Sequence, residues 1–133
     1  MAGEKNLALL LKNMQPRLNL GSYVFCIVPA DFDLNGTTII AAFREKEGVT
    51  VVLEVGLADK LNLVYETPMA WITLEVHSAL DAVGLTAAVS HVLAKENISC
   101  NVIAAYHHDH IFVGKEDAQK ALNALLKLTS AIK

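Results

Sequence analysis

The order of hydrophobic periodicities in the second half of the chain is the feature that most constrains its fold. Trp71–His77 alternates apolar and polar residues, as a half-buried strand does, and Leu85–Glu96 repeats apolar residues at helical spacing. Alternation returns over residues 98–106 and 110–113, and the acidic pair that starts at Glu116 opens a final helix. This β-α-β-β-α order is typical of a ferredoxin-like α+β fold, in which helices cover one face of an antiparallel sheet.

A ferredoxin-like sheet needs a fourth strand, whereas the pattern in the second half closes in a helix. The first half predicts a helix over Asn6–Met14, strands at Tyr23–Val28, Thr37–Phe43 and Val49–Val55, and a short helix at Leu57–Leu61. The successive strands favour an antiparallel meander. We expect the N-terminal half to supply the missing strand, which gives two interlocked units that share sheet edges and one continuous hydrophobic core.

Composition excludes several classes of protein. Hydrophobic residues make up 53% of the 133 residues and charged residues 19%, which excludes a disordered chain. The net charge of −3 disfavours a nucleic-acid binder, and no apolar run approaches the roughly 20 residues of a membrane span. The apolar run Leu7–Leu11 is too short for a signal peptide. We therefore expect a cytoplasmic protein with no membrane or nucleic-acid partner.

The sequence offers no convincing catalytic or metal site. Cys26 and Cys100 lie in apolar runs, which predicts buried thiols with raised pKa values and low reactivity. The cluster His107–His110 contains metal-ligand side chains, but neighbours on a strand point to opposite faces and a hairpin turn separates them further. We expect a solvated turn at His107–Asp109, no metal, no cofactor and no enzyme activity, although zinc or manganese binding at this turn stays open.

Several motifs resemble the ACT domain, in particular small stand-alone tandem ACT proteins and the regulatory part of aspartate kinases. Tyr23–Cys26 and Ala42–Gly48 are similar to a degenerate first repeat of those proteins. The resemblance divides the chain into an N-terminal degenerate unit at 1–66 and a C-terminal ACT domain at 67–133. The motifs that carry it in the second half are Trp71-Ile-Thr-Leu-Glu-Val76, Val83-Gly-Leu85, Leu93-Ala-Lys-Glu-Asn-Ile-Ser99 and Ala105-Tyr-His-His-Asp-His-Ile-Phe-Val113.

The resemblance implies βαββαβ units that bind a small effector, most often an amino acid, at an interface between paired units. In the family that the chain resembles, ligand contacts typically come from a glycine-containing loop between a strand and a helix. Gly84 allows close approach of a ligand, and the unpaired N–H groups where the helix starts favour a carboxylate. An ordinary turn is the alternative interpretation of this loop. The residues that match the loop are Asp81, Ala82, Val83, Gly84 and Leu85.

Three further residues are candidate ligand contacts. Asn101 and Ile103 face away from the stripe that contains Cys100, on the strand edge that an adjoining ACT unit would pair with. Asp109 matches an acidic position of the ACT subclass, although aspartate is also common in turns for local reasons.

Two functions remain in competition. The first is a non-catalytic regulatory protein that binds an amino acid or a similar effector, forms a homodimer and controls an enzyme. The second is a structural subunit that docks a protein partner through a sheet edge without a small ligand.

Overall fold

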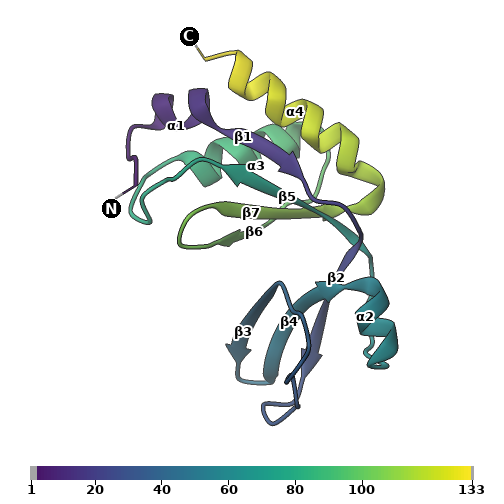
Figure 1. Ribbon diagram of the computed structural model, residues 1–133. Coiled ribbons are helices and arrows are strands. Elements are labelled where there is room, and N and C mark those ends of the chain that lie inside the picture. The colour runs from purple at the N-terminus through teal and green to yellow at the C-terminus, as the bar shows by residue number, and fades with distance from the viewer. Residues whose placement is uncertain (1–2, 133) are drawn as a thin grey trace. The chain divides into compact units, whose positions relative to one another are not determined.

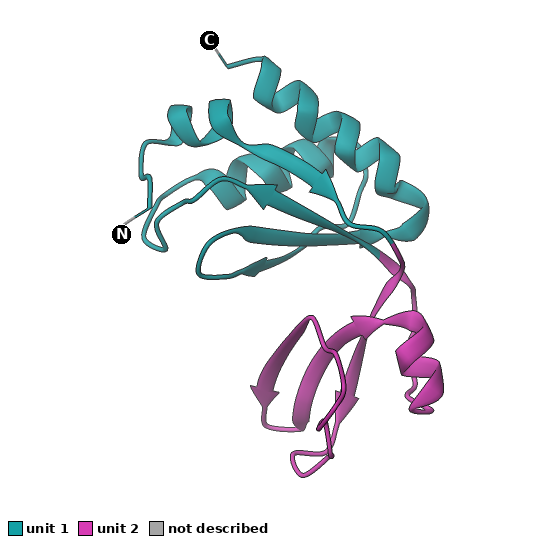
Figure 2. Cartoon of the chain, viewed as in Figure 1, with its two compact units in different colours: residues 1–20, 70–133 teal, residues 21–69 magenta. Residues whose placement is uncertain are grey.

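The computed structural model describes residues 3–132, and its contacts divide the chain into two compact units (Figure 2). Unit 1 comprises residues 1–20 and 70–133, and unit 2 comprises residues 21–69. The compact units therefore group the first twenty residues with the C-terminal half. The expected division at residues 66 and 67 concerns the sequence repeats and stays a prediction.

Unit 1 contains a four-stranded arrangement in the order β1-β5-β7-β6. Strand β1 pairs antiparallel with β5, from Gln15 opposite Glu75 to Leu18 opposite Ile72. The N-terminal half thus supplies the missing fourth strand, as expected. The elements are α1 (Leu7–Asn13), β1 (Gln15–Leu18), β5 (Met69–Glu75), α3 (Leu85–Lys95), β6 (Asn101–Ala104), β7 (Asp109–Gly114), a 3-10 turn (Lys115–Asp117) and α4 (Ala118–Ser130).

Strand β1 itself was not among the expected elements. It contains Pro16, which cannot donate a backbone hydrogen bond and which argues against a strand in a sequence pattern. The strand lies at an end of the strand order within unit 1, where a proline is tolerated.

The helices of unit 1 cover one face of its strands (Figure 1). Alternation along β5 and β7 directs one set of side chains toward this face, where they meet apolar residues of α1, α3 and α4. The fully buried members include Ile72, Leu74, Ile111 and Val113 from the strands and Leu10, Val89, Leu93 and Leu125 from the helices.

Unit 2 is a smaller version of the same plan with β4 as its central strand. It consists of β2 (Tyr23–Val28), β3 (Ala41–Glu45), β4 (Gly48–Glu54) and α2 (Val55–Lys60). Because β4 pairs with both β2 and β3, the order is β3-β4-β2 and the expected meander was wrong. The connection over residues 29–40 carries the chain past the central position to the outer strand β3.

The buried residues form two separate clusters, so the expectation of one continuous core was wrong. In unit 2 the cluster is built from alternate residues of β2 and β4 together with Ala58 of α2. Each set of strands has its own cover: α3 and α4 in unit 1, and α2 with side chains such as Phe32 and Leu34 in unit 2. Within residues 3–132, no helix has the length and apolar character needed to cross a membrane.

Candidate functional site

The start of helix α3 is shaped by Gly84. This residue has a φ angle of 106°, in the left-handed region that glycine adopts without strain. Its carbonyl accepts the hydrogen bond from the Ala88 N–H that begins the helix. No side chain caps this end, so no side chain accepts a hydrogen bond from the first-turn N–H groups at Leu85 and Thr86. This helix end can accept an anionic group.

Asp109 provides a carboxylate beneath the same helix end. It is the first residue of β7, and alternation with Ile111 and Val113 points its side chain toward the helix-covered face. Only 8% of the residue is exposed; no hydrogen bond to its carboxylate is present among the described residues, and its oxygens remain accessible from the cavity. Burial raises the pKa of Asp109, while His110 and His108 oppose the rise.

The structure corrects the expected turn at His107–Asp109. Asp109 is not in the turn, because it pairs with Ala104 in the last register position of the β6–β7 hairpin. Residues 105–108 form the connection instead.

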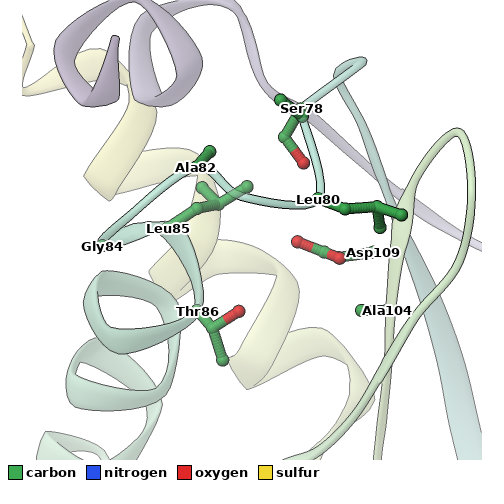
Figure 3. A pocket seen from close by; sticks show the side chains of 9 residues that line it. Ser78, Leu80, Ala82, Gly84, Leu85, Thr86, Ala104 and Asp109 are labelled. Carbon is green, nitrogen blue, oxygen red and sulfur yellow. The ribbon is translucent and has the colours of Figure 1, made fainter. Parts of the chain in front are cut away.

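Asp109 and the start of α3 line a cavity of about 130 Å³ (Figure 3). The carboxylate projects into the space between the loop that follows β5 and the first turn of α3 (Figure 3). The cavity thus presents N–H groups suited to an anion and an unpaired carboxylate suited to a cation. It can hold a molecule that carries both charges.

Some of the candidate residues come together at this cavity and others do not. Ala82, Gly84, Leu85 and Asp109 line it. The remaining candidates do not line it.

Asp81 and Val83 belong to the loop but do not line the cavity. The Asp81 carboxylate forms an ion pair with Lys5 Nζ at 2.8 Å, and this interaction lowers its pKa. Val83 is 83% exposed. Asn101 and Ile103 lie on β6 with their side chains opposite the core-facing Val102, and Asn101 Nδ2 donates to the Phe112 carbonyl at 3.2 Å.

Sequence reasoning missed the other residues that line the cavity. Ser78, Ala79 and Leu80 precede the glycine in the loop, Thr86 lies in the first turn of α3, and Ala104 faces Asp109 across the hairpin. The alternation over residues 98–106 already places Ala104 on the core-facing side, so that signal was available in the sequence.

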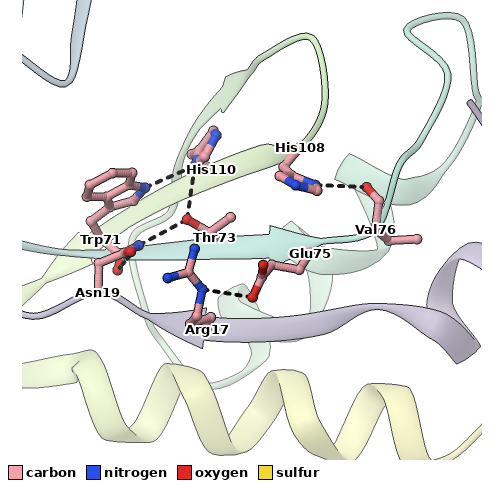
Figure 4. A network of polar contacts seen from close by, with 8 residues as sticks. All are labelled: Arg17, Asn19, Trp71, Thr73, Glu75, Val76, His108 and His110. Carbon is pink, nitrogen blue, oxygen red and sulfur yellow. Dashed lines mark hydrogen bonds and ion pairs between the residues drawn. The ribbon is translucent and has the colours of Figure 1, made fainter. Parts of the chain in front are cut away.

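The opposite face of the strands in unit 1 carries a hydrogen-bonded network (Figure 4). Trp71 Nε1 donates to His110 Nδ1 at 3.0 Å, and Thr73 Oγ1 lies 3.1 Å from the same nitrogen. Thr73 Oγ1 in turn accepts from Asn19 Nδ2 at 3.0 Å. Nδ1 is therefore an acceptor, which places the proton of the neutral ring on Nε2. Burial, with His108 and Arg17, lowers the pKa of His110, while Asp109 raises it.

The remaining histidines and the two cysteines are candidates for metal binding or nucleophilic chemistry. In the described part of the chain, no three histidine, cysteine, aspartate or glutamate side chains are grouped so that they could hold a metal ion. Cys26 is buried and Cys100 half-buried, and burial raises the pKa of both thiols. Such thiols are poor nucleophiles at neutral pH.

Comparison with known families agrees with this architecture. A model of the ACT domain matches residues 2–70, and a second ACT-domain model matches residues 66–127. The chain belongs to the ACT-domain family. Its two ACT matches follow one another along the sequence, as the motifs predicted.

Solved structures contain similar ACT-type folds. A Vibrio cholerae protein of unknown function, described as a possible transport protein, is 51% identical over 94% of this chain and 97% of its own, with a TM-score of 0.85. An Agrobacterium tumefaciens protein is 17% identical, over 87% of this chain and 89% of its own, with a TM-score of 0.71.

A third structure is the ligand-free regulatory subunit of aspartate kinase from Thermus thermophilus. It is 9% identical over 89% of this chain and 97% of its own, with a TM-score of 0.65. At such low identity, this structure and the Agrobacterium protein show only the shared fold. No curated protein matches the sequence.

Proposed function

We propose that this ACT protein is a non-catalytic regulator that binds a small amino acid in the cavity of unit 1. The observation that carries the proposal is the Asp109 carboxylate, which is 8% exposed, has no donor among the described residues and lines a cavity beside an uncapped helix end. Burial raises the cost of this charge, and the ammonium group of a ligand would offset that cost.

The charges of the cavity define how the amino acid binds. The N–H groups of the first turn of α3 bind the ligand carboxylate, and Asp109 binds the ammonium group. The hydroxyl groups of Ser78 and Thr86 are the polar side chains available to a polar ligand substituent. Asp81 has no direct part, because Lys5 already neutralises it.

The size of the cavity restricts the ligand further. A cavity of about 150 Å³ accommodates benzene, which has six non-hydrogen atoms. The cavity of about 130 Å³ is slightly smaller but not fully enclosed, so it suits glycine, alanine or serine, which have about five to seven non-hydrogen atoms. Lysine and the aromatic amino acids must extend out of it.

Calorimetry with a matched set of compounds tests the proposal. We expect glycine, L-alanine and L-serine to bind more tightly than L-lysine and L-phenylalanine. Acetate and methylammonium each carry only one of the two charges, so they serve as controls and are expected to bind weakly. Equal or tighter binding of either single-charge compound would contradict the zwitterion site.

Regulation requires that the ligand changes an interaction with another molecule. We expect the protein to act in the cytoplasm as a homodimer whose stability the ligand changes, and to control an enzyme through that change. Light scattering with and without L-serine measures the first step. An unchanged molar mass across protein concentrations that span the transition would contradict it.

A sheet face in unit 2 favours the second candidate function, an assembly subunit that acts without a small ligand. Ile27 of β2 and Phe43 of β3 both lie opposite Thr50 of β4, on the same face, and are 54% and 72% exposed. Exposed apolar side chains grouped in this way are suited to docking a protein. Replacement of Phe43 by serine would abolish assembly under this function and leave amino-acid binding unchanged under the first.

A further inference from the structure

The segment Gly3–Leu7 lies along the loop that lines the cavity, and we call it the N-terminal strap. The Glu4 N–H donates to the His77 carbonyl, and the Glu4 carbonyl accepts from the Ala79 N–H, both at 2.9 Å. Glu4 and Ser78 thereby form a parallel β-bridge. Ser78 and Ala79 line the cavity, so the strap is hydrogen-bonded to a segment that forms part of the cavity wall.

Two side-chain contacts continue the strap along the same loop. Lys5 Nζ lies 2.8 Å from Asp81 Oδ2. Leu7 packs against Gly84, because a β-carbon placed on that glycine would lie 2.9 Å from Leu7 Cδ2. The strap therefore contacts the loop near its start, at its middle and at Gly84, the residue before α3.

Gly3 allows this close approach. A β-carbon at residue 3 would lie 2.5 Å from the Ala79 nitrogen and 2.6 Å from the Ser78 carbonyl carbon. These are backbone atoms, so the strap or the loop would have to move to accommodate any other residue.

We propose that the N-terminal strap holds loop 78–84 in its ligand-binding conformation, with Gly3 and Lys5 as positioning residues for the cavity. The backbone of this loop forms a wall of the cavity, so its position decides whether Ser78 and the start of α3 can reach one ligand at the same time. The effect on affinity rests on the amino-acid site proposed above. The effect on the loop does not depend on any ligand.

Hydrogen exchange of the loop amides and calorimetry with L-serine test the strap in the full chain. The variants are Gly3→Ala, Lys5→Asp and the charge swap Lys5→Asp with Asp81→Lys. Lys12→Asp is the matched control, because Lys12 lies on α1 and has no ion pair among the described residues.

We expect Gly3→Ala and Lys5→Asp each to accelerate hydrogen exchange in residues 78–84. The charge swap should return the exchange rate to the wild-type value, and the Lys12 control should leave that rate unchanged. Affinity for L-serine should fall about two- to fivefold in Lys5→Asp, as for an exposed ion pair. It should fall roughly tenfold in Gly3→Ala, where backbone atoms must move.

Each outcome separates the strap from the proposed ligand site. Unchanged loop exchange in both single variants would overturn the strap, as would faster exchange with an unchanged affinity for L-serine. If the wild type binds no tested amino acid, the proposed function fails and loop exchange alone decides the strap. If Gly3→Ala does not fold, the Lys5 variant and its charge swap still give the answer.

Discussion

Replacing Asp109 by asparagine should make the protein more stable and its ligand affinity lower. The substitution keeps the shape of the side chain and removes its charge. In the folded protein the residue is 8% exposed, and its carboxylate oxygens meet the cavity instead of a donor among the described residues. The same carboxylate is the proposed partner of the ligand ammonium, so one change acts on stability and binding in opposite directions.

The gain in stability should depend on pH. Burial raises the pKa of Asp109, so the folded state holds its proton more tightly than the unfolded chain, whose value is about 3.9. The wild type therefore loses stability as pH rises from the unfolded value through the raised folded value. The asparagine variant has no titrating group at this position and no such dependence. At pH 7 we expect a gain of about 1 kcal/mol in the free energy of unfolding, the usual cost of an unsatisfied buried group, and little gain near pH 3.

The loss of affinity should be larger than the gain in stability. Removing one partner of a desolvated charge pair costs roughly 2–5 kcal/mol, which corresponds to at least a thirtyfold weaker affinity for L-serine. Urea unfolding and calorimetry on the same preparations measure the two effects, with Asp31→Asn as an exposed control in unit 2. A variant that is less stable at pH 7, or that keeps wild-type affinity, would refute the reasoning.

Further predictions concern the start of α3, the polar network and the core. Gly84→Ala should lower the free energy of unfolding by about 1–3 kcal/mol, because its φ of 106° strains any other residue; urea unfolding measures this, and wild-type stability would contradict it. His110 has a lowered pKa and accepts from Trp71, so stability should fall as pH drops below about 6.5 and through the folded value; NMR titration of the ring measures that value, and titration above 6.5 would oppose the prediction. Leu93→Ala should cost roughly 2–5 kcal/mol and Leu126→Ala, on the exposed side of α4, far less; similar losses in urea would argue against the packing described.

The sequence predicted the helices of unit 1 well, because their apolar residues repeat at helical spacing between clear boundaries. Helix α3 was expected at Leu85–Glu96 and is observed at Leu85–Lys95, with Gly84 at its start. Strand β1 was missed because four residues that include Pro16 carry little periodic signal. Its place beside β5 follows from the pairing of distant segments, which local patterns do not encode.

The order of strands in unit 2 was mispredicted for a related reason. Hydrophobic alternation identifies strands but does not say which of them pair, and short connections favour neighbours. The twelve-residue connection 29–40 instead leads to an outer strand, so that β4 becomes central. The strand expected at Thr37–Phe43 begins only at Ala41, so the connection is longer than the sequence pattern indicated.

A one-residue boundary error placed Asp109 in the turn, so only the family resemblance made it a candidate ligand contact. The expected turn at His107–Asp109 made this aspartate a solvated loop residue. Extending β7 by one residue from His110 puts Asp109 in phase with Ile111 and Val113 and therefore on the buried face. The polar residues of the histidine cluster indicated a turn, so the start of the strand was predicted one residue too late.

The two ACT units differ in the feature that the proposed ligand site requires. In unit 1 the segment between β5 and β6 contains helix α3, whose uncapped start faces Asp109. In unit 2 the corresponding segment, residues 29–40, contains no helix, and all of its residues are described. Unit 2 therefore lacks the first-turn N–H groups that would bind a carboxylate at that position. The mostly buried Asp109 charge has a desolvation cost, and a zwitterion bound at the start of α3 would offset it. On this reasoning each chain binds one amino acid through unit 1, and calorimetry that gave two equivalent sites per chain would contradict it.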